Sequence, residues 1–175
     1  MAGREHELNP VSHITTGAIG PAGKRVFYLQ ARSDAEFVTL IVEKAQVQSL
    51  AIGLEQYLQE LQQRYPSLEE ASPEFDEAAM ALEVPLDPAF RVGQLGLGYD
   101  EASDHLVLVA SELQVEGADP EEAAVARFWC TRSQLRAMCR WGIEVAGRGR
   151  PICGNCGEPI DPEGHFCPKR NGHKH

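Results

Sequence analysis

The sequence of 175 residues lacks any long hydrophobic run. A helix that crosses a bilayer needs about 20 consecutive apolar residues, and no segment approaches that length. The opening residues MAGREHELNP also lack the basic end and the apolar centre of a signal peptide. We therefore expect a cytoplasmic protein that has no membrane partner.

Cysteine is scarce as well, with five in the chain. Because a reducing compartment keeps thiols free, we expect no disulfide framework. Basic residues are few before Arg127: this part holds 7 of the 16 Lys and Arg residues but 22 of the 26 acidic ones. An acidic body repels polyanions, so contact with nucleic acid is expected only through the C-terminal part.

The residue pattern predicts an α+β fold, with an antiparallel sheet and two main helices. Leucines at three- and four-residue spacing predict a helix over 47–61 that stops at Tyr65-Pro66. A capping box formed by Thr131 and Gln134 predicts a second helix that ends at Gly147. Mixed aromatic, β-branched and polar segments predict strands at 11–19, 25–32, 36–43, 93–99, 105–110 and 124–130.

The chain divides into an α+β domain at 1–149 and a zinc-binding tail at 150–175. Each half of the domain reads as strands followed by one helix, so a degenerate strand-strand-strand-helix repeat in a pseudo-twofold sheet is one possible layout. Residues 67–89 are acidic and punctuated by proline, which predicts a solvated linker. Phe75, Met80 and Leu82 are its candidate contacts with the core.

The C-terminal segment carries the most specific signal. Cys153 and Cys156 are separated by two residues and followed by glycine, the pattern of a zinc knuckle, and Cys167 adds a third thiolate. Three soft ligands favour Zn²⁺. The segment has too few large apolar residues to fold unaided, so the ion is expected to order it.

The fourth ligand is expected to be a histidine. A ribbon with four cysteines would place the last one at Arg170, which cannot bind the ion. His165 lies two residues before Cys167, so both side chains face the same side of an extended strand. His173 is the alternative, and His175 is a more remote one. Four protein ligands would close the coordination sphere and make the zinc structural, since catalysis needs a position open to water.

Several runs carry a resemblance to a known family: RVFYLQA, GQLGLGYD, RFWCTRSQ and, above all, CGNCGEPIDPEGHFCPKRNG. They resemble the actinobacterial family known as domain of unknown function 3090, over nearly the whole chain. The family pattern includes a Gly-His-x-Cys-Pro element, which corresponds to 164–168 and favours His165 as the ligand. The resemblance implies a bacterial, cytoplasmic setting and no particular activity.

Other residues offer weaker signals. Arg132, Arg136 and Arg140 share one face of the second predicted helix and lead into the tail, so they are candidates for binding a partner. The glycines at 93–98 lie within a strand pattern and do not predict a phosphate site. Isolated histidines and cysteines are expected to be structural rather than catalytic; these are His6, His13, His105, Cys130 and Cys139.

The combined hypothesis is a non-enzymatic adaptor that contacts a protein, or a nucleic acid, through the tail and the arginine face. One alternative is an enzyme with a pocket between sheet and helices, in which zinc is structural or completes the site. A second alternative is a thiol sensor that releases zinc on oxidation. The sequence indicates no oligomeric state.

Overall fold

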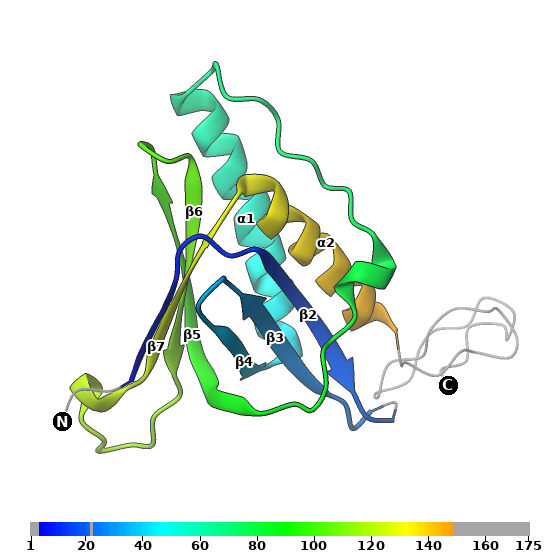
Figure 1. The fold of residues 1–175 in the computed structure, drawn as a ribbon, viewed down its shortest axis with the longest axis vertical. Helices are drawn as coiled ribbons and strands as arrows, with labels where there is room; N and C mark the ends of the chain where they lie inside the picture. Colours follow the sequence, from blue (N-terminus) through cyan, green and yellow to red (C-terminus); the bar gives the residue numbers. More distant parts are fainter. Residues whose placement is uncertain (1–3, 22, 149–175) are drawn as a thin grey trace, which may run out of the picture.

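A sheet of seven strands packs against two helices (Figure 1). This arrangement comes from a computed structural model that describes residues 4–21 and 23–148. The strands are β1 (Glu5–Leu8), β2 (His13–Ile19), β3 (Val26–Arg32), β4 (Phe37–Val42), β5 (Pro88–Asp100), β6 (His105–Glu112) and β7 (Val125–Cys130). The helices are α1 (Lys44–Arg64) and α2 (Arg132–Gly147), with short 3₁₀ turns η1 (Glu77–Met80) and η2 (Pro120–Glu122).

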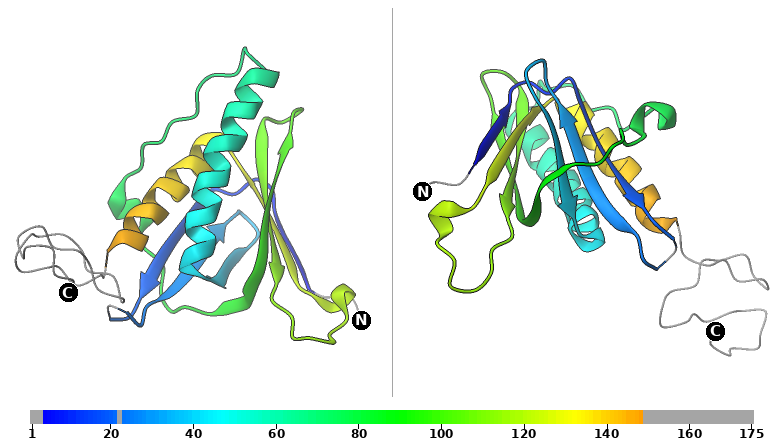
Figure 2. Two further views of the ribbon diagram at one scale, coloured as in Figure 1. Left: turned by 180° about the vertical axis from the view of Figure 1, so that it is seen from behind. Right: turned by 60° about the horizontal axis from the view of Figure 1, so that its bottom comes forward.

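The strand order is β1-β7-β6-β5-β4-β3-β2. Although β1 and β2 are the two edges, only residues 9–12 separate them in the chain. There, the Val11 amide donates to the Trp129 carbonyl (2.9 Å), and the Ser12 amide donates to the Arg32 carbonyl (2.7 Å). The chain thus passes directly from one edge to the other, which requires the sheet to curl. Figure 2 shows the two groups of strands splayed apart, with both helices on one face.

The predicted α+β class and the two helices are confirmed. Thr131 caps α2, and its side chain and that of Gln134 form the expected reciprocal hydrogen bonds. The sheet is mixed rather than purely antiparallel, because β1–β7 and β4–β5 pair in parallel. Parallel pairing of β4 with β5 is possible because α1 and the residues after it form a long crossover.

A strand-strand-strand-helix order occurs twice, as β2-β3-β4-α1 and β5-β6-β7-α2. However, the third strand of the first unit pairs with the first strand of the second. A step along the sheet therefore relates the two units, and not the twofold axis that was one of the layouts compatible with the sequence. Strand β1 was not predicted.

The core lies between the sheet and the two helices. Leu106 and Leu108 on β6 and Phe128 on β7 are fully buried, as are Leu54 on α1 and Leu135 on α2. Gly142 lets α2 approach closely, because a Cβ there would lie 2.7 Å from Val47 Cγ1 and 3.0 Å from Thr16 Cγ2. In the described part of the chain, no helix is both long and apolar enough to cross a membrane.

The second half of the acidic segment crosses the other face of β2, β3 and β4 (Figure 2, right view). Thr15, Gln30 and Thr39 are neighbours across these strands, and all three are buried. The Gln30 amide donates to the Glu83 carbonyl (2.9 Å) and accepts from the Glu83 amide (2.8 Å). Thr15 Oγ1 donates to the Met80 carbonyl (2.7 Å). Side chains therefore bind this segment much as a neighbouring strand would.

Apolar contacts hold the same segment. Met80 is buried, and Leu82 fills the space left by the missing side chain of Gly17. Farther back, Phe75 packs against Trp141 of α2, with 5.6 Å between ring centroids. The expected contacts of Phe75, Met80 and Leu82 are thus present, and the segment follows the body of the protein.

Candidate functional site

The predicted zinc ligands Cys153, Cys156, His165 and Cys167, and the alternative His173, lie outside the described residues. Among residues 4–21 and 23–148, no three His, Cys, Asp or Glu side chains are grouped to hold a metal ion. The candidate site that the structure does place is the arginine face of α2.

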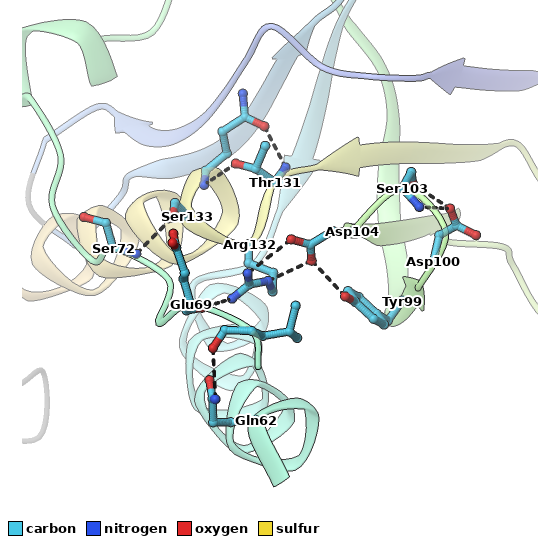
Figure 3. Close-up of polar contacts among 12 residues, drawn as sticks. Gln62, Glu69, Ser72, Tyr99, Asp100, Ser103, Asp104, Thr131, Arg132 and Ser133 are labelled. Carbon is cyan, nitrogen blue, oxygen red and sulfur yellow. Dashed lines mark hydrogen bonds and ion pairs between the residues drawn. The ribbon is translucent and has the colours of Figure 1, made fainter. Parts of the chain in front are cut away.

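Arg132, the first residue of α2, lies at the centre of a polar cluster (Figure 3). Its guanidinium donates to both carboxylate oxygens of Asp104, from Nε at 2.9 Å and from a terminal nitrogen at 3.2 Å. A third bond reaches the Glu69 carbonyl at 2.6 Å. Tyr99 donates its hydroxyl to the same Asp104 carboxylate at 2.8 Å. Arg132 therefore joins α2, the β5–β6 turn and the acidic segment.

Arg136 makes an equivalent set of contacts one turn along the helix. It donates to both oxygens of Glu55 on α1, at 2.9 and 2.8 Å, and to the Ala71 carbonyl at 2.5 Å. Glu70 lies 3.6 Å away. Only 14% of the Arg136 side chain is exposed, against 53% for Arg140, whose guanidinium is 3.9 Å from Glu55. Of the three predicted arginines, two are thus bound within the fold and one faces solvent.

Charge and burial set the ionisation of this cluster. The hydrogen bonds from Arg132 hold the pKa of Asp104 below its ordinary value, although partial burial opposes the shift. The same pair raises the pKa of Arg132. Burial, followed by the bond to Asp104, raises the pKa of Tyr99 to about 12. At neutral pH the cluster therefore holds a carboxylate, a guanidinium and a neutral phenol.

A cleft of about 410 Å³ lies between α1, the start of α2 and the acidic segment. Its walls include Glu55, Gln59, Gln62, Arg132 and Arg136. Since both arginines already meet carboxylates and backbone carbonyls, an anion entering this cleft would have to displace those partners. Arg132 and Arg136, which we call the arginine clamp, therefore tie α2 to α1, to the β5–β6 turn and to the acidic segment, and so stabilise the fold.

The two described cysteines are poor nucleophiles where they lie. Both are buried and free of disulfides. Burial raises the pKa of Cys139 to about 12 and the pKa of Cys130 further still. A thiol acts as a nucleophile or metal ligand in its thiolate form, which burial disfavours.

Each of the three described histidines has one buried ring nitrogen without a hydrogen-bond partner among the described residues. His6 Nδ1 bonds to the Glu36 carboxylate, but its Nε2 is buried without a hydrogen-bond partner among the described residues. The same is true of His13 Nε2 and His105 Nδ1. These side chains come from different strands and, within the part that the structure describes, belong to no group of three His, Cys, Asp or Glu residues that could hold a metal ion.

A second depression, lined by both apolar and polar side chains, lies between α1, α2 and the acidic segment. It has a volume of about 690 Å³ and is lined by Ile52, Phe75 and Ile143, among others. We call it the helix groove.

Sequence reasoning identified the arginines but not their acidic partners. Asp104 lies 28 residues from Arg132, and Glu55 lies 81 residues from Arg136. No local motif marks such pairs. The four-residue spacing of the arginines was the only available signal, and it indicates a shared helix face without showing what that face meets.

A comparison with known protein families gives one match. The family model described as "Protein of unknown function (DUF3090)" matches residues 6–167, which is most of the chain. The protein belongs to this family. The match extends through Cys153, Cys156, His165 and Cys167. Neither the curated proteins nor the solved structures contain a match to the chain.

Proposed function

We propose that this protein is a non-enzymatic adaptor that binds a protein partner through a C-terminal segment folded around one structural Zn²⁺. The observation that carries the proposal is the donor set Cys153, Cys156, His165 and Cys167. Three thiolates and one imidazole match the ligand number and softness of closed structural zinc sites. When bound, the ion supplies folding free energy to a segment that is short of apolar residues.

The arginine clamp favours a protein partner over a nucleic acid. Phosphate binding needs cationic side chains that are free to face the backbone of the nucleic acid. Arg132 and Arg136 instead face Asp104 and Glu55, and the remaining body is strongly acidic. Cysteines that bind zinc must not be oxidised to disulfides. A reducing compartment keeps them reduced, which supports a cytoplasmic location for the adaptor.

The test has a metal arm and a partner arm. Elemental analysis of the purified, untagged chain should give one zinc per molecule, and Cys153→Ser should lose it. Affinity capture from native cells should then recover partners that bind the unaltered chain and not the variant. Cys130→Ser is the matched control, because it changes a buried cysteine of the body.

Two results would contradict the proposal. Absence of stoichiometric metal from the unaltered protein would remove the zinc site and the adaptor together. Tight DNA or RNA binding at moderate salt that is weakened by Arg140→Ala would instead assign the partner to the nucleic-acid class.

A further inference from the structure

The helix groove exposes apolar side chains on the outer surface of the two helices, which face the viewer in the left view of Figure 2. Ile52 of α1 is 63% exposed and Ile143 of α2 is 44% exposed. Phe75 of the acidic segment forms part of the wall and is backed by Trp141. Exposed apolar side chains that cluster in one depression are a feature of binding surfaces.

The rim of the groove is acidic. Glu55, Glu74 and Glu144 border it, and Arg140 is the only cation among its lining residues. Glu55 is partly neutralised by Arg136 and Glu144 by Arg148, whereas Glu74 makes no ion pair with any described residue. A complementary occupant therefore has an apolar side chain for the floor and cationic side chains beside it.

The last residue described at the C-terminal end lies next to this groove. The Arg148 guanidinium stacks over the Trp141 ring at 4.8 Å from its centroid. It also pairs with Glu77 at 2.8 Å and with Glu144 of the groove rim at 3.3 Å. Arg25 donates to the Arg148 carbonyl and to the Val145 carbonyl, which fixes the end of α2. The chain thus leaves the body within reach of the groove.

We propose that the helix groove is the seat of this chain's own C-terminal segment, residues 149–175, when that segment holds zinc. This inference rests on the proposed zinc site. A zinc knuckle is too small to enclose a large aromatic side chain, so Phe166, between ligands His165 and Cys167, needs a surface to pack on. Phe166 supplies the apolar side chain, and Lys169 and Arg170 supply the cations.

The chain length permits this docking. Ile143 lies five residues before Arg148 on α2, a rise of about 8 Å along the helix axis. The four residues from Gly149 to Ile152 can span about 13 Å when extended. A knuckle that begins at Cys153 can therefore reach Ile143 without disturbing α2.

Methyl NMR on the full-length protein tests the proposal. Labelling the isoleucine δ1 methyls reports on Ile52 and Ile143 in the groove, and on Ile19, an exposed control on β2. In the zinc-loaded protein we expect nuclear Overhauser contacts from Ile52 or Ile143 to the Phe166 ring. Removing zinc with a chelator should abolish these contacts and shift both groove methyls, while the Ile19 methyl stays in place.

Phe166→Ala should reproduce the shifts of Ile52 and Ile143 while the protein still binds one zinc. Phe166→Leu should restore them in part, and Ile52→Lys should remove the effect of zinc on Ile143. If one zinc is bound and the chemical shifts of the groove methyls change neither on zinc removal nor with Phe166→Ala, the docking proposal is wrong, although the zinc site stands. Groove methyls that respond only when a captured partner is added would also overturn it. If no zinc binds, both proposals fail.

Discussion

Asp104 holds Arg132 with both carboxylate oxygens while its own backbone occupies the left-handed region, at φ 52°. Aspartate and asparagine are among the few residues with a side chain that adopt this conformation readily. The position is therefore constrained twice, by the β5–β6 turn and by the arginine at the start of α2. One residue joins the outer part of the sheet to the helix layer.

Replacing Asp104 by asparagine should lower the free energy of unfolding by about 1 kcal/mol. Hydrogen bonds to charged groups contribute about 1.5–3 kcal/mol, but the Asp104 side chain is 45% exposed and solvent screens part of the interaction. Asparagine adopts the left-handed backbone conformation as readily as aspartate does. The change in the free energy of unfolding therefore reports on the lost carboxylate charge alone. Urea denaturation at neutral pH measures it. Arg140→Ala is the control, because its solvent-facing pair should change stability by less than about 0.5 kcal/mol. Equal urea midpoints for the Asp104→Asn and unaltered proteins would show that the pair contributes nothing.

The raised pKa of Tyr99 predicts a loss of stability at alkaline pH. In the folded protein the phenol titrates at about 12, against an ordinary value of 10.0. The folded state therefore favours the protonated phenol, and its contribution is complete below about pH 10 and declines as the pH rises towards 12. Unfolding measured across this range should show a steeper decline for the unaltered protein than for Tyr99→Phe. Parallel pH profiles for the two proteins would contradict this assignment.

The Leu82 side chain packs against the backbone of Gly17, and a double-mutant cycle can test this contact. A Cβ at position 17 would lie 2.7 Å from Leu82 Cγ, so Gly17→Ala should destabilise the protein by about 1–3 kcal/mol. In the presence of Leu82→Ala the same substitution should cost much less, because the obstructing side chain is gone. Thermal unfolding of the four proteins gives the coupling.

Gly96→Ala is the matched control in the same sheet. A Cβ at position 96 meets nothing within 4 Å and requires no left-handed backbone. It should therefore be close to neutral. If Gly17→Ala is as benign as Gly96→Ala, Leu82 does not fill the space beside Gly17 in solution.

The elements that could be predicted from sequence are those whose signal is local. The leucine spacing of α1 and the Thr131 capping box of α2 each depend on residues within a few positions of one another. Strand β1 has only four residues, and three of them are polar or charged, so it has no recognisable alternation. It becomes a strand because β7, more than a hundred residues away, offers it a parallel partner.

The acidic segment is a second case in which residues far apart in the sequence decide the structure. Its composition predicts a solvated connection, yet Gln30 binds the Glu83 backbone in both directions across 53 residues of sequence. Nothing in the sequence around Gln30 indicates that its side chain will bind the backbone of Glu83. The arginine face is similar, since the spacing of Arg132 and Arg136 could be read from the sequence but Asp104 and Glu55 depended on the topology.

Single substitutions can decide whether His165 or His173 is the fourth zinc ligand. We predict that His165→Ala weakens zinc binding by more than about 100-fold, which exceeds the loss typical of a residue that only orients a ligand. His173→Ala should bind zinc as tightly as the unaltered protein. Competition with a chromophoric chelator measures both affinities, and Cys153→Ser sets the value for a lost ligand. A tight-binding His165→Ala protein together with a weak His173→Ala protein would assign the imidazole to His173. Phe166 would then no longer lie between two ligands, and the docking geometry proposed for the helix groove would have to change with it.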